Sequence, residues 1–149
     1  MSEIPIGVAA LEAVVLTVLA HLNNGEVDDA VTRFAEEFRF KDHGIGLEFK
    51  DKERLREFFQ KTRELYPDSF LRTDTILVSG DHVIIEWTLQ TTLIEPFYGA
   101  LSRKVRVSLQ GASIVRTDKD MITDWSDYYD GLMSRRTALA SYFTEWVEL

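Results

Sequence analysis

The sequence of 149 residues contains no cysteine and only three histidines, and these scarcities exclude several kinds of chemistry. Without cysteine there is no disulfide, no thiolate nucleophile and no zinc–sulfur site. His21, His43 and His82 have no metal-ligand spacing such as H-x-x-x-H, and no acidic cluster completes a site around them. The sequence also lacks a glycine-rich phosphate loop and a G-x-S-x-G motif. We therefore expect no metal and no other cofactor.

Basic residues are also scarce, since 17 Lys and Arg face 25 Asp and Glu and leave a net charge of −8. Such a charge repels phosphate backbones, so we expect no nucleic-acid partner. Long hydrophobic runs are missing too, because Glu12, Thr17 and His21 interrupt the apolar N-terminal stretch, and no basic segment precedes it. This pattern predicts neither a signal peptide nor a membrane span. We expect a cytoplasmic protein with one domain over residues 1–149.

Apolar residues at helical spacing predict three helices in the first half of the chain. The first runs through Leu11 and Leu22 and ends at the "NNG" of residues 23–25. A second, short helix is predicted to bury Val27, Val31, Phe34 and Phe38. Asp51 is a suitable N-cap for a third helix, which ends at Pro67 and has four residues on its buried side: Leu55, Phe58, Phe59 and Leu65.

Alternating patterns predict strands elsewhere in the chain. One early strand contains Phe38, Phe40 and Asp42, and residues 70–129 read as strands joined by turns, with a hairpin at Gly80-Asp81. A turn over residues 94–102 is expected to expose Phe97 and Tyr98, and residues 132–147 are expected to form a final helix. This order predicts an α+β fold, in which N-terminal helices cover a cone-shaped, curved antiparallel sheet and leave a hollow suited to a ligand.

The stretch "ITDWSDYYD", residues 122–130, carries a candidate catalytic acid. In a strand, Asp127 shares a face with Trp125 and Tyr129, whereas Asp124 lies on the other face. If the first face lines the hollow, its apolar surroundings raise the pKa of Asp127. Half protonation at neutral pH requires a shift of about three units, or roughly 4 kcal/mol. The alternative is that Asp127 only hydrogen-bonds to backbone at the strand end.

Asp42 is the second candidate catalytic acid, because it follows Phe40 at the same period of two. A carboxylate with apolar neighbours can take a proton from carbon or oxygen, although Asp42 could also be a solvated residue of a glycine-rich bulge. The adjacent His43 is a third catalytic candidate, with a surface turn residue as its alternative. Aromatic and apolar residues on the same faces are predicted to contact the substrate: Phe40, Trp87, Leu89, Trp125 and Tyr129. For Trp87 the alternative is an ordinary core position.

The predicted layout, together with "RFAEEFRFKD", "LREFF" and "ITDWSDYYD", resembles the nuclear transport factor 2-like superfamily over nearly the whole chain. Within it, the sequence is most similar to SnoaL-like polyketide cyclases and limonene epoxide hydrolase. The resemblance implies a homodimer and a site in the hollow. Asp42 matches the general-base aspartate of ketosteroid isomerases. Asp127 matches the aspartate that the hydrolases use to handle the nucleophilic water and that the cyclases use as acid/base.

The sequence departs from these relatives at positions that their reactions need. The oxyanion donors of the isomerases fall at Val18 and about Gly111, which have no side-chain hydrogen-bond donor. The arginine and the second aspartate of the hydrolases fall at Trp87 and Leu89. We therefore expect neither steroid isomerisation by that route nor epoxide opening.

Two hypotheses of different class remain open. In the first, the protein is a cofactor-independent enzyme in which Asp42 and Asp127 transfer protons on a small hydrophobic cyclic or aromatic substrate. A lyase or dehydratase is favoured, with isomerase or cyclase chemistry as variants. In the second, the protein is a non-catalytic module for binding a small ligand or for dimeric assembly. Whether both carboxyl groups reach the same hollow discriminates between the two.

Overall fold

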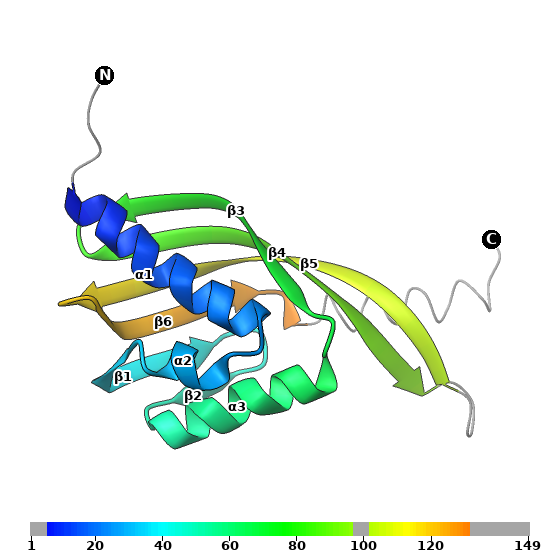
Figure 1. Cartoon of the computed structure of the whole chain (residues 1–149). Coiled ribbons are helices and arrows are strands. Elements are labelled where there is room, and N and C mark those ends of the chain that lie inside the picture. The colour runs from blue at the N-terminus through cyan, green and yellow to red at the C-terminus, as the bar shows by residue number, and fades with distance from the viewer. Residues whose placement is uncertain (1–5, 97–101, 132–149) are drawn as a thin grey trace.

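A computed structural model describes residues 6–96 and 102–131 and confirms the α+β class. The helices lie on one side of a curved, open sheet, and β4 and β5 extend beyond the other strands (Figure 1). Along the chain the elements are α1 (Ile6–Asn23), α2 (Val27–Val31), β1 (Phe34–Asp42), β2 (Leu47–Phe49), α3 (Lys52–Leu65), β3 (Phe70–Ser79), β4 (His82–Pro96), β5 (Ser102–Asp118) and β6 (Met121–Tyr129).

The sheet has the strand order β2-β1-β6-β5-β4-β3. Its pairings are antiparallel as predicted, with the exception of β1 and β6, which run parallel. Hydrophobic alternation identifies a strand but carries no information on its direction, so the sequence pattern missed this pairing. Parallel neighbours need a long crossover, and here α3 and the β3–β5 meander supply it. The pairing joins the two strands that carry the candidate acids.

One boundary and one buried position of the predicted helices were wrong. The second helix ends at Val31, and Phe34 and Phe38 are buried on strand β1 instead. A spacing of four residues fits one face of a helix and also one face of a strand, and pairing of Phe34 with Ile122 of β6 decided for the strand. Leu65 was predicted to be buried, but it is the last residue of α3 and 59% exposed.

Other local predictions are confirmed. The Asp51 carboxylate caps α3 by accepting hydrogen bonds from the backbone N–H groups of Glu53 and Arg54. The hairpin between β3 and β4 turns at Gly80, whose φ of 60° lies in the left-handed region that glycine tolerates. The predicted helix over 132–147 and the turn containing Phe97 and Tyr98 lie outside the described residues.

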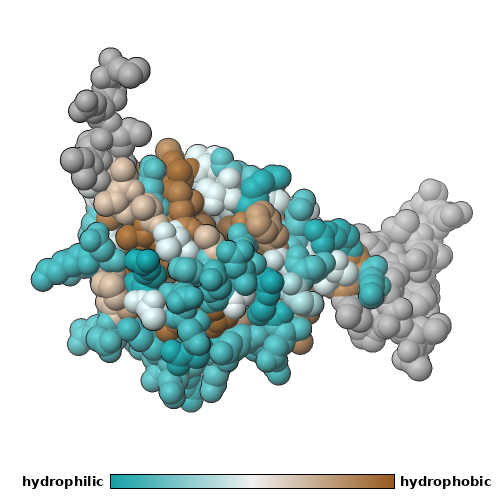
Figure 2. All heavy atoms as spheres, viewed as in Figure 1, coloured by the Kyte–Doolittle hydropathy of each residue, from teal (hydrophilic) through white to brown (hydrophobic). Residues whose placement is uncertain are grey.

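An aromatic cluster joins the helices to the sheet. Phe34 is fully buried, and its ring lies 5.3 to 6.5 Å from the rings of four neighbours: Phe38, Phe40, Phe59 and Trp125. Edge-on and tilted contacts at these separations stabilise a core beyond simple burial. Figure 2 shows apolar residues gathered along α1 and a hydrophilic surface over α3. No helix in the described part of the chain has the length and apolar character needed to cross a bilayer.

Candidate active site

A cavity of about 460 Å³ lies between the helices and the inner face of the sheet. This volume is within the usual range for small-molecule sites. Its walls are mainly apolar and come from α1, α3 and the strands, including Val18, Leu19, Leu22, Phe58, Phe59, Leu71, Leu89 and Leu109. Seven of the eight predicted site residues line it: Phe40, Asp42, Trp87, Leu89, Trp125, Asp127 and Tyr129.

A second hollow, of about 880 Å³, is larger and more open. It lies between the start of α1 and the turns that follow β3 and β5, where Arg116 and Asp81 form an ion pair of 2.9 Å. Its lining contains neither of the candidate acids and no aromatic side chain. Size alone would select this hollow, but the enclosed apolar cavity has the chemistry of a ligand site.

Asp42 and Asp127 lie side by side on the parallel pair of strands. They are register partners of β1 and β6, and both line the cavity. The backbone N–H of His43 donates to the carbonyl of Asp127 at 3.0 Å and continues the pairing past the end of β1. The Asp42 side chain is buried and accepts a hydrogen bond of 3.1 Å from the N–H of Ile45. Two carboxyl groups that are remote in sequence thus share one apolar cavity.

Asp127 is held by two donors on the same oxygen. Ser113 Oγ donates to Oδ1 at 2.5 Å, and Trp125 Nε1 donates to it at 2.7 Å. Burial raises the pKa of Asp127 to about 6, the two hydrogen bonds lower it, and the charge of Asp42 raises it. At pH 7, one unit above this pKa, about a tenth of the Asp127 carboxyl groups are protonated. A shift of three units would have left half of them protonated at that pH.

Tyr129 supplies a polar group beside the acids. Burial raises the pKa of its phenol above the ordinary value, and so do its side-chain hydrogen bond with Asp42 and the charges of both aspartates. The phenol is therefore protonated at neutral pH and serves as a hydrogen-bond donor. Its ring occupies the space that a side chain at Gly44 would need, because a Cβ there would overlap the ring atoms.

His43 is the predicted site residue that does not line the cavity. Its ring is exposed and stacks on Tyr128, with ring centroids 4.3 Å apart and planes at 9°. Tyr128 points away from the face that carries Asp127 and Tyr129, as strand alternation requires. The alternative prediction for His43, a surface turn residue, therefore describes its position. We place His43 outside the candidate site.

The sequence reading missed Ser113. This residue is 1% exposed and lines the cavity next to Asp127. Trp87 Nε1 donates to its hydroxyl at 2.9 Å, so Trp87 is neither plain core nor only a stacking surface. The alternation along β5 contained the signal, since Leu109, Ser113 and Val115 share one buried face and a serine between apolar residues needs a polar partner.

Asn23 lines the cavity at the end of α1. Its amide side chain donates to the carbonyl of Leu71 and accepts from the N–H of the same residue, both at 2.9 Å. Arg63 of α3 donates to the carbonyl of Asn23 at 3.2 Å. These contacts attach α1 to β3 and α3, so they hold the helical wall of the cavity against the sheet.

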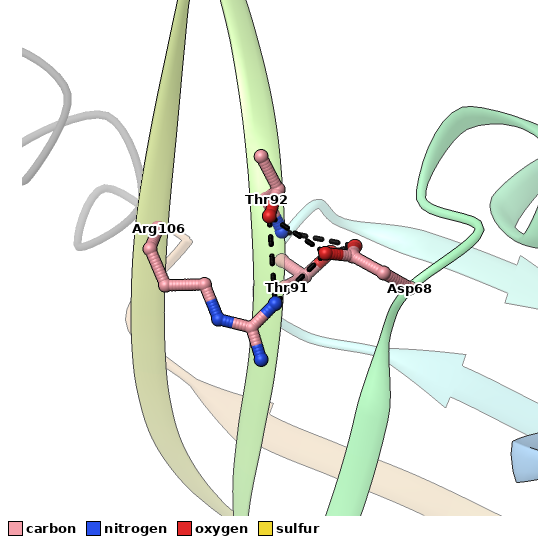
Figure 3. A network of polar contacts seen from close by, with 4 residues as sticks. All are labelled: Asp68, Thr91, Thr92 and Arg106. Carbon is pink, nitrogen blue, oxygen red and sulfur yellow. Dashed lines mark hydrogen bonds and ion pairs between the residues drawn. The ribbon is translucent and has the colours of Figure 1, made fainter.

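A polar network anchors the loop between α3 and β3 (Figure 3). This loop contributes Tyr66 and Ser69 to the cavity lining. The carboxylate of Asp68 accepts hydrogen bonds from the side chains of Thr91, Thr92 and Arg106, and from the N–H of Thr92. The hydrogen bonds from Thr92 are the main reason that the pKa of Asp68 is below its usual value. The Arg106 side chain is exposed and also contributes to this network.

The sequence pattern indicated no acidic cluster around a histidine, but the structure brings a group of potential metal ligands together at the surface. In residues 6–96 and 102–131 it consists of His21, Glu26 and Asp29, whose ligand atoms lie within 4.8 Å of one another. His21 Nδ1 is already 3.2 Å from the Glu26 carboxylate. None of the three residues lines the cavity, so the candidate site does not depend on them.

The fold and site define an α+β domain in which helices cover one side of a curved sheet and two acids line an apolar cavity. The chain belongs to the SnoaL-like domain family, whose model matches residues 15–125. No curated protein matches the sequence.

Solved structures share the fold at low sequence identity. A putative SnoaL-like polyketide cyclase from Jannaschia sp. CCS1 is 18% identical, with a TM-score of 0.76 over 95% of this chain and 98% of that one. An LEH-like epoxide hydrolase of M. tuberculosis is 18% identical, with a TM-score of 0.70 over 95% and 98%. A hypothetical protein with a ketosteroid isomerase-like fold from Catenulispora acidiphila DSM 44928, in complex with trimethylamine, is 23% identical, with a TM-score of 0.67 over 78% and 84%. At these identities the similarity establishes the fold alone.

Proposed function

We propose that the protein is a cofactor-independent enzyme in which Asp42 and Asp127 carry out acid/base proton transfer on a small hydrophobic cyclic or aromatic substrate. The observation that carries this proposal is the register pairing of the two acids in one apolar cavity. Elimination, as in a dehydratase or another lyase, is the reaction that we favour. Isomerisation and cyclisation need the same pair of proton transfers and are variants of the proposal.

The surroundings of the two acids suggest different roles in elimination. With a pKa of about 6, Asp127 populates both protonation states near neutral pH, and its protonated form can donate to a leaving oxygen. The Asp42 carboxylate then accepts the proton from the neighbouring carbon. The carbon–oxygen bond breaks as the carbon–carbon double bond forms, and water leaves. Afterwards Asp42 releases its proton to solvent and Asp127 takes one up from solvent, so both groups return to their starting states.

The size and lining of the cavity support a substrate with one small ring system. About 460 Å³ accommodates such a molecule, and the aromatic rings of Phe40, Trp87 and Trp125 offer apolar surfaces around it. The Tyr129 phenol donates its one hydrogen to Asp42, and its oxygen can accept a hydrogen bond from a hydroxyl group of the substrate. A ring with one or two oxygen substituents therefore matches both the walls and the polar end of the cavity.

The test is proton transfer itself, which can be measured before the natural substrate is known. A panel of cyclic and aromatic ketones and hydroxyketones is incubated with the protein in D₂O, with deuterium uptake followed by mass spectrometry and loss of water by enone absorbance. Asp127→Asn and Asp42→Asn should each lower the rate about 100-fold or more. Asp124→Asn is the matched control, because it makes the same change on the same strand outside the cavity.

Full turnover in Asp127→Asn would contradict the proposal. Two observations together would support the binding-module alternative. Panel compounds would raise the melting temperatures of the wild type and of both cavity variants equally, and the wild type would catalyse no deuterium exchange. In that case the acids would contribute polarity to the cavity and no chemistry.

We also propose a homodimer, formed through the face of the sheet opposite the helices. Leu77, Ile84 and Ile114 are register neighbours across β3, β4 and β5, and Leu77 and Ile114 are exposed. An exposed apolar row of this kind favours association. Light scattering after gel filtration should give twice the chain mass, and Ile114→Lys should give a monomer.

A further inference from the structure

We infer that Ser113 and Trp87 are positioning residues, which hold the Asp127 carboxyl group so that its Oδ2 alone exchanges a proton with the substrate. This inference rests on the proposed role of Asp127 and adds which of its oxygens reacts and which residues select that oxygen.

The direction of each hydrogen bond in the chain follows from the chemistry of its donor. An indole N–H can only donate, so Trp87 Nε1 must donate to Ser113 Oγ, which accepts at 2.9 Å. The hydroxyl hydrogen of Ser113 is then directed to Asp127 Oδ1, 2.5 Å away. Trp125 Nε1 donates to the same oxygen at 2.7 Å. Oδ1 therefore receives two hydrogens.

This arrangement decides where the carboxyl proton resides. A proton on Oδ1 would compete with the two hydrogens already directed at that oxygen, so protonated Asp127 carries its proton on Oδ2. Among the described residues, no recorded hydrogen bond reaches Oδ2. Asp127 lines the cavity, so the free oxygen is available to a bound molecule.

The donors are fixed by burial. Trp87, Ser113 and Trp125 are 4%, 1% and 3% exposed, so water does not compete for their hydrogen bonds. In such surroundings a satisfied polar network is rigid and its hydrogen bonds are strong. The carboxyl group is thus held in one orientation before any substrate binds, which is the condition for efficient proton transfer.

Gly111 allows Trp87 to take its position. The two residues are register partners of β4 and β5, and a Cβ at Gly111 would overlap the six-membered ring of Trp87. The Trp87 ring also lies 6.0 Å from that of Tyr129. The glycine and the tyrosine together define the place of the indole, and hence the direction of its N–H toward Ser113.

Nuclear magnetic resonance of the indole N–H groups tests the inference on the full chain without substrate. In the wild type, the ¹⁵N and ¹H shifts of Trp125 and Trp87 should both titrate with the Asp127 carboxyl carbon, at a midpoint near 6. In Ser113→Ala, Trp125 should still titrate whereas Trp87 becomes independent of pH. The midpoint of Asp127 should also rise, because a hydrogen bond that favours the carboxylate is lost. Ser113→Thr keeps the hydroxyl and should restore both signals, and Asp127→Asn should abolish both titrations.

Two results would overturn the inference: a Trp87 resonance in the wild type that does not respond to pH, or one that still titrates in Ser113→Ala. Should Ser113→Ala fail to fold, Trp87→Phe keeps an aromatic ring and removes only the indole donor. Trp125 should then continue to titrate and the Asp127 midpoint should rise, whereas an unchanged midpoint would refute the role of Trp87.

The kinetic counterpart separates positioning from binding. On a substrate found with the panel, Ser113→Ala should lower kcat about tenfold with little change in KM, and should move the pH profile in the same direction as the Asp127 midpoint. A change in KM alone would contradict the inference. The resonance titrations require no turnover, so their failure would leave the proposed function standing, whereas an active Asp127→Asn variant would remove the proposed function itself.

Discussion

Asp42 and Asp127 are register partners on neighbouring parallel strands, although 84 positions separate them in the chain. Side chains of paired residues in adjacent strands lie on the same face of a sheet, and this face is the one that the helices cover. The like charge of Asp42 is one cause of the raised pKa of Asp127, after burial. The two acids therefore interact electrostatically within the cavity.

The first prediction concerns stability and pH. The pKa of Asp127 is about 6 in the folded protein against a reference of 3.8, so the folded state binds this proton more tightly. Its stabilising effect is complete below pH 3.8 and is lost as the pH rises through 6, a difference of about 3 kcal/mol. Asp127→Asn removes the ionisable group and with it this loss of stability at high pH. The asparagine amide oxygen can still accept hydrogen bonds from Ser113 and Trp125. Urea unfolding should show the variant more stable than the wild type at pH 8, with a difference that shrinks towards pH 4.

Comparison at each pH cancels the contributions of other acids, such as Asp68, whose pKa is lowered. Asp124→Asn provides the control and should show no such pH-dependent gain. If Asp127→Asn is less stable than the wild type at pH 8, burial of the ionised Asp127 carboxylate does not destabilise the folded protein, and the prediction is wrong.

The second prediction concerns the coupling of the two acids. Asp42→Asn removes the negative charge that raises the pKa of Asp127, so the midpoint of the Asp127 carboxyl carbon should fall below 6. Burial remains, and the midpoint should therefore stay above 3.8. Carbon-detected titration of labelled protein measures this shift. An unchanged midpoint would show that the two carboxyl groups do not interact.

The third prediction concerns Gly44. A methyl group at this position would overlap the ring of Tyr129, so Gly44→Ala must displace the tyrosine or the turn. Overpacking of this kind costs about 2 kcal/mol, measurable by urea unfolding, and should also lower turnover because the phenol loses its place beside Asp42. Gly7→Ala in α1 is the control, since a Cβ there meets nothing within 4 Å, and it should be neutral or slightly stabilising. Equal effects of both substitutions would contradict the assigned packing.

The fourth prediction concerns the anchored loop. Asp68→Asn weakens the hydrogen bonds to Thr92 and Arg106, which hold the loop that carries Tyr66 and Ser69 at the cavity. Substrate affinity should fall, so KM should rise about threefold to tenfold while kcat changes less than about twofold. Asp74→Asn disrupts a similar network with Arg72 and Thr88 away from the cavity and should leave both constants unchanged. A lower kcat with constant KM would place Asp68 in the chemistry instead.

Much of the architecture could be read from local patterns. The helical spacing of α1 and α3, the cap at Asp51 and the turn at Gly80 depend on residues close together in the chain, and each was predicted correctly. The end of α2 was not, because Phe34 and Phe38 fit a helix and a strand equally well. Long-range pairing with β6 resolved that ambiguity, and a pattern read along one segment contains no information about its partner.

For the site, alternation in the sequence by itself determined that Asp42 and Asp127 share faces with large aromatic residues, since side-chain direction along a strand is a local property. Only the tertiary structure decided that these faces meet in one cavity, because the parallel pairing of β1 and β6 joins segments with no mutual signal in the sequence. It also brought Ser113 to Asp127 and turned His43 outward onto Tyr128. A hydrogen bond between strands depends on register, and register is set when the whole sheet packs against its helices.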